Sequence, residues 1–165
     1  MCIRDRSVLD AIKDFDIEEV FIKWPNDIYF KDKKICGILA ETTLQYDTAI
    51  VENLVIGIGI NVNSRISNII PTAISMYEIL GFEIKRYTII GKIIQSFDDY
   101  IRLPYEELFE NWRKNIGFIG RKIILRIGEE EMKCTLIDVS KTGEIIVEEN
   151  NTIKKFGYGE VSIIP

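Results

Sequence analysis

The string KWPND carries residues suited to holding a phosphate group. Lys23 ends an apolar stretch, and Asn26 and Asp27 follow it at a turn. A lysine supplies a point charge for a phosphoryl group, and amide and carboxylate oxygens are hard ligands that Mg²⁺ takes directly or through water. The chemistry favoured is a phosphate and Mg²⁺ station with Asp27 as the metal ligand. The alternative is an ordinary strand-ending turn with a solvated lysine and a buried Trp24.

A second string, KKICGIL, follows a charged turn and brings a further lysine, Lys34, and a glycine within a β-type run, Gly37. Glycine weakens a strand, so it often marks a place where a ligand or another backbone comes close. An exposed, charged hairpin with a β-bulge explains the same residues equally well.

A third string, VIGIGINVNS, places Gly57 and Gly59 two residues apart, so on a strand both leave the same face bare. Asn61 follows and offers groups that hydrogen-bond an adenine edge or a ribose hydroxyl. The dinucleotide-binding fingerprint is rejected, because it needs a third glycine and a following helix, and Val62 stands there instead. Tight packing of a strand against a helix is the structural alternative.

Composition excludes several kinds of chemistry. The chain has no His, so neither a Ser-His-Asp device nor a His-ligated metal can form within it. A net charge of -5 and the lack of a Lys/Arg-rich block argue against a duplex-DNA binder. Three widely spaced cysteines favour a reducing, cytoplasmic setting, and no apolar run is long enough to span a membrane.

The first part of the chain, before residue 117, is predicted to contain the helices and strands that position these residues. The patterns predict a helix over 8–15 and strands at 20–22, 28–30, 35–41 and 49–60. These elements would support the three strings. A short helix begins at Pro71 and ends at Gly81, and a longer one is interrupted at Pro104. The longer helix has an apolar stripe of Ile90, Ile93, Ile94, Phe97 and Ile101.

The ends of the chain differ from this pattern. Residues 1–7 show no periodicity, and we expect them to be a non-native leader outside the fold. After residue 117, short β-type runs separated by turn formers indicate a small five-stranded barrel, with strands at 122–127, 132–139, 144–148, 152–156 and 161–164.

In this order, the three strings together resemble the catalytic region of biotin–protein ligases. That family has a KWPND strand end, a (K/R)K-(I/L)-x-G-(I/V)-L-x-E strand and a G-x-G-(I/L)-N-V-N strand, which correspond here to 23–27, 33–41 and 57–63. The resemblance implies an α+β fold, with a mixed β-sheet packed by helices and similar to class II synthetases over 8–116. An SH3-like barrel over 117–165 is implied after it.

The resemblance also implies a reaction. Biotin is activated with ATP to biotinyl-5'-AMP and transferred to a lysine of a biotin carboxyl carrier domain, the partner within a carboxylase. By analogy, Lys34 is the catalytic lysine that contacts both the biotin carboxylate and the α-phosphate. Asp27 and Asn26 would organise Mg²⁺ and the phosphates, and Lys23 would support them.

The glycines and the asparagine also receive roles from the resemblance. Gly37 would let the ligand lie against its strand. Gly57 and Gly59 would leave space for the adenosine, which Asn61 would hold. The segment 64–76 corresponds to a loop that orders over the adenylate. Its family string A-T-S-L/M is Ala-Ile-Ser-Met here, so the threonine is replaced.

The chain departs from the family in one larger respect. The Gly/Arg-rich biotin-binding string G-R-G-(R/K)-x-G-R, which lies upstream of KWPND in the family, is absent from the sequence. The chain therefore resembles an N-terminally truncated ligase fragment, and we expect it to have little or no ligase activity alone and to expose apolar surface. A lipoate-type acyl ligase or transferase and a non-catalytic nucleotide-binding module are the alternatives. No winged helix-turn-helix precedes the fold in this sequence.

Overall fold

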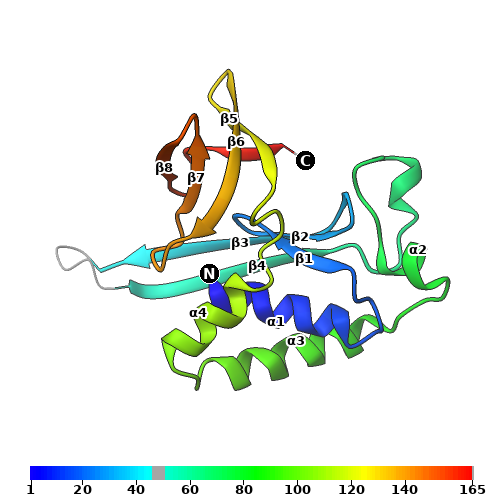
Figure 1. Ribbon diagram of the computed structural model, residues 1–165. Coiled ribbons are helices and arrows are strands. Elements are labelled where there is room, and N and C mark those ends of the chain that lie inside the picture. The colour runs from blue at the N-terminus through cyan, green and yellow to red at the C-terminus, as the bar shows by residue number, and fades with distance from the viewer. Residues whose placement is uncertain (46–50, 165) are drawn as a thin grey trace.

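The computed structural model describes residues 1–45 and 51–164 and contains two antiparallel sheets with helices packed against the first (Figure 1). Residues 49 and 50, which were expected to begin a strand, lie outside the described part. The α+β class is confirmed. No helix in the described ranges has both the length and the apolar character needed to cross a membrane.

The first sheet holds all three strings and has the strand order β1-β2-β3-β4. Its strands are β1 (Val20–Lys23), β2 (Asp27–Phe30), β3 (Lys33–Leu44) and β4 (Val51–Ile60). The expectation of a mixed sheet is wrong for these strands, because every neighbouring pair is antiparallel. Among the described residues, parallel pairing occurs at two isolated bridges, Ile22 of β1 with Ile116 and Lys34 of β3 with Ala73.

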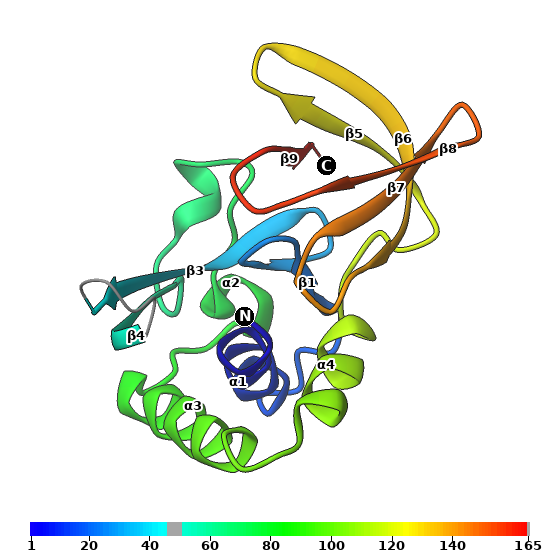
Figure 2. The same ribbon diagram turned by 90° about the vertical axis from the view of Figure 1, so that its left-hand side faces the viewer.

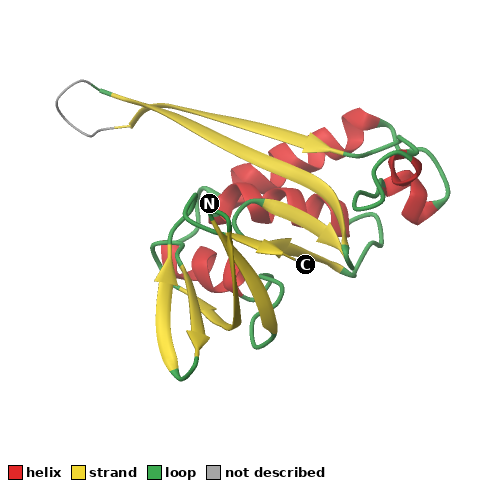
Figure 3. Cartoon of the chain, turned by 90° about the horizontal axis from the view of Figure 1, so that it is seen from above, coloured by secondary structure: helices red, strands yellow, loops and turns green. Residues whose placement is uncertain are grey.

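The helices α1 (Cys2–Lys13), α3 (Arg86–Tyr100) and α4 (Tyr105–Arg113) lie on one side of this sheet, and the C-terminal strands lie on the other (Figures 1 and 2). Fully buried side chains of α1 meet the lower face of the sheet, and the core includes Leu9, Ile12, Ile22, Ile28 and Ile38. This packing buries one face of β1, β2 and the start of β3, whereas β4 has no buried residue, and the two long strands reach past the shorter ones (Figure 3).

Helix α1 begins earlier than expected. It starts at Cys2 rather than at Val8, so most of the segment predicted to lie outside the fold is helical. The reason is a distant contact: Asp5 is fully buried and accepts a hydrogen bond from Trp112 Nε1 at 3.0 Å. A buried carboxylate without such a partner would be costly. The non-native origin of residues 1–7 stays a prediction.

The helix expected from Pro71 is shorter than predicted. Helix α2 (Met76–Leu80) begins after Ser75, which forms a capping box with Glu78. Residues before Ser75 do not join the helix, because Thr72 and Ile74 hydrogen-bond the backbone of Lys34. The predicted end is confirmed: Gly81 has a φ of 80°, a left-handed conformation that glycine adopts at little cost.

The apolar stripe of the long helix is only partly buried. Ile90, Ile94 and Ile101 are 54%, 64% and 59% exposed, whereas Ile89 is 2% exposed. Periodicity identified the helix but not the face that contacts α1. Pro104 interrupts the helical region as predicted, since α3 ends at Tyr100 and α4 begins at Tyr105.

The C-terminal strands form a second sheet of order β8-β7-β6-β5-β9, curled as Figure 2 shows. The pairs between its strands do not include β8 with β9, so the expected closed, SH3-like barrel is not confirmed. The strand bounds agree closely with the predicted ones: β5 (Lys122–Ile127), β6 (Glu130–Val139), β7 (Ile145–Glu149), β8 (Thr152–Phe156) and β9 (Ser162–Ile164).

Polar contacts tie the second sheet to the first part of the chain. Arg113 of α4 makes two hydrogen bonds to the Asp138 carboxylate, of 2.5 and 2.7 Å. Trp24, in the KWPND turn, donates its indole N–H to the carbonyl of Gly143 at 2.8 Å. The turn that carries Asn26 and Asp27 is therefore braced by the C-terminal sheet.

Candidate functional site

Lys34 and Asp27 form an ion pair on the open side of the first sheet. Lys34 Nζ lies 2.6 Å from Asp27 Oδ1, and the two side chains are 41% and 21% exposed. Asp27 begins β2 and pairs with Gly37 of β3, so the antiparallel register brings the turn and the returning strand together. A cation beside a carboxylate is thus held at the edge of the open face, accessible to a ligand.

Gly37 provides the space for this pair. A Cβ atom at Gly37 would lie 3.0 Å from Lys34 Nζ and 3.4 Å from Asp27 Oδ1. Any side chain there would press on the lysine. Gly37 was predicted to let a ligand approach the strand. In the structure, the space it leaves is next to the protein's own Lys34–Asp27 ion pair.

Lys23 is the second cation near Asp27. Its Nζ donates to the hydroxyl of Tyr29 at 3.1 Å and lies 4.6 Å from the centre of that ring. Burial lowers the pKa of Lys23, the Asp27 carboxylate raises it, and the charge of Lys34 lowers it further. Lys23 therefore belongs to the same electrostatic group as Lys34 and Asp27, although its ammonium is engaged with Tyr29.

Asn26 has a structural role in the turn. Its side-chain amide donates to the carbonyl of Ile38 at 2.7 Å, and the Ile38 N–H donates back to the Asn26 carbonyl at 2.9 Å. This two-way contact fixes the turn on β3. The predicted phosphate role of Asn26 stays a prediction. Trp24 is buried, as the structural alternative for the turn supposed.

Gly57 and Gly59 lie on β4 opposite Leu39 and Gly37. A Cβ at Gly57 would meet only Leu39 Cβ, at 4.0 Å, and one at Gly59 would meet only the Gly37 carbonyl oxygen, at 3.8 Å. No atom of a helix lies within that range among the described residues. The alternative of tight strand–helix packing is therefore wrong, and the two glycines border open space.

Asn61 lies where β4 ends and the 64–76 segment begins. Its N–H donates to the carbonyl of Ile35 at 3.0 Å, and its side-chain amide donates to the carbonyl of Ile74 at 3.3 Å. Asn61 is thus next to both the strand of Lys34 and the loop. Its predicted contact with adenosine stays a prediction.

The donor set permits a magnesium ion only in combination with a ligand. Within residues 1–45 and 51–164, no cluster of three or more His, Cys, Asp or Glu side chains is placed to hold a metal. Asp27 is a single carboxylate, and Mg²⁺ in nucleotide sites commonly takes one or two carboxylates plus phosphate oxygens and water. Asp27 fits that arrangement, and the predicted Mg²⁺ stays a prediction.

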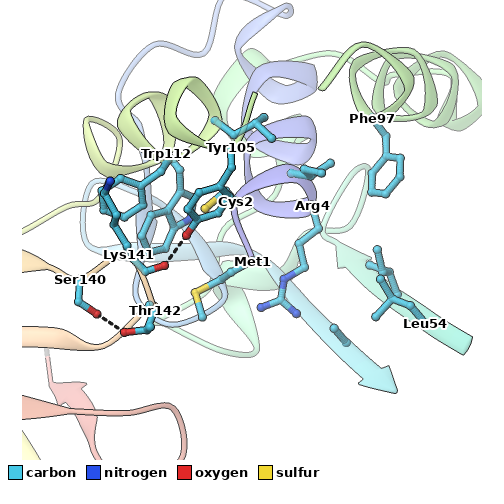
Figure 4. Close-up of a pocket in the computed structure, with 16 residues that line it drawn as sticks. Met1, Cys2, Arg4, Leu54, Phe97, Tyr105, Trp112, Ser140, Lys141 and Thr142 are labelled. Carbon is cyan, nitrogen blue, oxygen red and sulfur yellow. Dashed lines mark hydrogen bonds between the residues drawn. The ribbon is translucent and has the colours of Figure 1, made fainter. Parts of the chain in front are cut away.

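A cavity of about 340 Å³ lies away from these residues (Figure 4). Tyr105, Trp112, Lys141 and Thr142 line it together with Met1 and its neighbours on α1, and none of the predicted site residues does. We place the candidate site at the ion pair rather than in this mostly apolar cavity, because the site residues predicted from the three strings gather at the ion pair and none of them lines the cavity.

The three strings lie in a part of the chain that matches known proteins. A model of the biotin/lipoate A/B protein ligase family matches residues 5–61, which include all three strings up to Asn61. The bifunctional ligase/repressor BirA of Escherichia coli (strain K12) is 28% identical over 160 residues, covering 93% of this chain and 49% of BirA. The biotin--[acetyl-CoA-carboxylase] ligase of Mycobacterium tuberculosis is 22% identical over 147 residues, covering 87% and 53%.

The solved structures agree with the sequence matches. The apo biotin protein ligase of Aquifex aeolicus has a TM-score of 0.83 and 26% identity, covering 99% of this chain and 73% of that one. The same ligase in complex with biotin and ATP has a TM-score of 0.77 at 26% identity, covering 99% and 69%. The chain is similar to biotin protein ligases in sequence and in fold. It spans about half the length of the curated relatives it matches.

The sequence analysis missed three residues around the site. The Tyr29 hydroxyl accepts a hydrogen bond from the Lys23 ammonium, and the Gly143 carbonyl accepts one from the Trp24 indole. Glu78 accepts a hydrogen bond from Ser67 and so holds the loop beside Lys34. Only Glu78 left a signal in the sequence, because Ser75 followed three residues later by glutamate is a capping box. The other two contacts join separate elements and have no local pattern.

Proposed function

We propose that this chain carries the adenylate-forming face of a biotin–protein ligase. The reaction is the ATP-dependent activation of biotin to biotinyl-5'-AMP, followed by transfer of biotin to a lysine of a biotin carboxyl carrier domain. The observation that supports it most directly is the Lys34–Asp27 pair at the edge of a glycine-lined open face. The A. aeolicus ligase in complex with biotin and ATP, which this chain resembles along nearly its whole length, adds support.

In the first step, an oxygen of the biotin carboxylate forms a bond to the α-phosphorus of ATP, and the bond to pyrophosphate breaks. Both reactants are anions, so their approach is opposed by charge. The Lys34 ammonium, placed between them, offsets that repulsion and the charge that grows in the transition state. Lys34 and Asp27 are the residues assigned to catalysis.

Asp27 holds Lys34 before the reactants arrive. At 2.6 Å, the contact fixes the ammonium at the site, and the lysine remains exposed enough to change partners. The nearby charge of Lys23 adds to the positive potential around the phosphates. A Mg²⁺ ion bound with the nucleotide would neutralise part of the phosphate charge, with Asp27 as its protein ligand.

Gly37, Gly57 and Gly59 provide a surface without side chains, on which biotinyl-5'-AMP lies, and Asn61 bonds its adenosine end. In the second step, the acceptor lysine amine attacks the biotin carbonyl of the mixed anhydride. A C–N bond forms, AMP leaves with the bonding electron pair, and the amine loses a proton. The carrier domain of a carboxylase is the proposed protein partner.

ATP binding tests the role of Lys34. We expect Lys34→Ala to weaken ATP binding by about tenfold or more, the effect of losing one charge-assisted contact. Lys33→Ala is the matched control, because Lys33 is the preceding residue on the same strand and should leave the affinity unchanged. Isothermal titration calorimetry on the full chain measures both. Equal affinities in the two variants would contradict the proposal.

A lipoate-type acyl ligase or transferase is the second candidate, because the matching family model includes both ligand classes. Titration with biotin and with lipoate separates the two, and we expect the chain to prefer biotin. We also expect the isolated chain to transfer little or no biotin to a carrier domain, since it has no Gly/Arg-rich string. Lys34→Ala also bears on a non-catalytic nucleotide-binding module: a residual nucleotide site that uses Lys34 would bind ATP more weakly in this variant, whereas the loss of a purely structural lysine on an exposed hairpin would scarcely change the affinity.

A further inference from the structure

The backbone of Lys34 has an unusual neighbour. Strand β4 ends at Ile60, opposite Cys36, and therefore does not reach Lys34. The 72–74 segment takes its place: the Lys34 N–H donates to the carbonyl of Thr72 at 2.8 Å, and the Ile74 N–H donates to the carbonyl of Lys34 at 2.9 Å. The position of Lys34 on this edge depends on how firmly that segment is held.

One carboxylate holds the segment at both ends. Glu78 Oε1 accepts from the backbone N–H and the hydroxyl of Ser67, at 3.1 and 2.6 Å. Glu78 Oε2 accepts from the backbone N–H and the hydroxyl of Ser75, at 2.9 and 3.1 Å. The 67–75 segment is thereby closed on itself through a side chain of α2.

The second arm goes beyond what a helix cap requires. A capping box needs only the reciprocal bonds between Ser75 and Glu78, which leave Oε1 with no task in the helix. The bonds to Ser67 instead tie down the far end of the segment. Ser75 is fully buried and Ala73 nearly so, which fixes the segment's other end against the fold.

We propose that Glu78 is a positioning residue, which holds the 67–75 segment so that Thr72 and Ile74 keep the backbone of Lys34 in place. This inference rests on the proposed function of Lys34. Glu78 touches no reacting atom and acts only through the backbone of Lys34.

Hydrogen–deuterium exchange of the full chain without ligand tests the contact directly. In Glu78→Ala we expect the Lys34 and Ile74 amides to exchange about tenfold faster, as loss of hydrogen bonds to a charged group predicts. Glu83→Gln, at an exposed carboxylate five residues further on, is the control and should exchange like the wild type. Unchanged exchange at Lys34 and Ile74 in Glu78→Ala would overturn the proposal.

Two further variants separate positioning from capping. Ser67→Ala removes the shorter, hydroxyl bond of the far arm, keeps the backbone N–H bond to Glu78 Oε1 and leaves the capping box intact, so a folded protein is expected even if Glu78→Ala unfolds. Faster exchange at Lys34 in Ser67→Ala, with the amides of α2 unchanged, supports positioning; unchanged exchange at Lys34 contradicts it. Glu78→Gln keeps a cap but cannot accept from both serine N–H groups. The exchange rate of its Lys34 amide should lie between the rates in the wild type and in Ser67→Ala, or equal the rate in Ser67→Ala.

ATP titration of the same variants links the contact to the proposed site. We expect Ser67→Ala to weaken ATP binding less than Lys34→Ala does, and Glu83→Gln to leave it unchanged. If the wild type binds no ATP, the proposed function fails, while the exchange result still decides whether Glu78 holds Lys34. If the wild type binds ATP and Ser67→Ala changes the exchange but not the affinity, the positioning role is refuted.

Discussion

Strands β3 and β4 both carry glycine on the open face of the first sheet, but their glycines have different surroundings. Gly37 on β3 borders the protein's own ion pair: a Cβ there would lie 3.0 Å from Lys34 Nζ, and the lysine side chain would have to shift. Gly57 and Gly59 on β4 have no such neighbour, since the nearest atoms would be at 4.0 and 3.8 Å. One glycine protects an ion pair, and the other two leave a surface that nothing in the described chain fills.

The difference distinguishes two uses of a strand glycine that look alike in sequence. A glycine whose Cβ would collide with a side chain is explained by internal packing. A glycine that faces open space on a strand reduces stability without an internal reason, which favours a ligand as the explanation. Substitutions on the two strands should therefore affect stability and binding in different proportions.

The largest effect is expected on β3. Gly37→Val should push the Lys34 ammonium away from Asp27 and fill the face above it, weakening ATP binding by about a hundredfold, near the upper range for a charged hydrogen bond. Calorimetric titration measures the affinity, and the NMR chemical shifts of the Lys34 side chain report the loss of the ion pair. An ATP affinity equal to that of the wild type would contradict the role assigned to Gly37.

A smaller effect, confined to binding, is expected on β4. Gly59→Val should weaken ATP binding by about tenfold through steric conflict with the ligand, and should leave stability unchanged or raise it by up to about 1 kcal/mol, because valine favours strands. Thermal denaturation and titration are measured on the same sample. A lower melting temperature with unchanged affinity would show that Gly59 serves packing instead.

The smallest effect is expected from pH, on the side of β3 where the 67–75 segment lies. Burial raises the pKa of Glu78, but hydrogen bonds from Ser67 and Ser75 outweigh it and lower the pKa from 4.5 to about 2. A depressed carboxyl pKa means that the contribution is fully present above about pH 4.5 and is lost as pH falls toward 2. The NMR chemical shift of the Ile74 amide should change with pH in this window in the wild type and not in Glu78→Gln. The chemical shifts of amides on β4 should show no such difference between the two proteins.

Features that depend on a single residue's backbone were predictable from the sequence. Gly81 ends α2 in a left-handed conformation, Pro104 precedes α4, and the charged turn between β2 and β3 lies where it was expected. The proximity of Lys34 and Asp27 also follows from local information, since a short hairpin sets the register that joins their strands.

Features that depend on distant partners were not predictable. The helix expected from Pro71 gives way to an extended segment because the Lys34 backbone competes for Thr72 and Ile74. Asn26 and Trp24 read as turn and core residues, yet their polar atoms are used on β3 and on the C-terminal sheet. Such contacts have no periodicity, so only the folded arrangement reveals them.

The bond from Trp24 to Gly143 has a consequence for how the molecule comes apart. It joins residues 119 positions apart in the chain, and the Arg113–Asp138 pair ties the second sheet to α4 on the helical side of the first part of the chain. Breaking either sheet would leave a buried indole N–H and a half-buried carboxylate without partners. Heating should therefore melt both sheets in one cooperative transition, with coincident curves in the near- and far-ultraviolet circular dichroism.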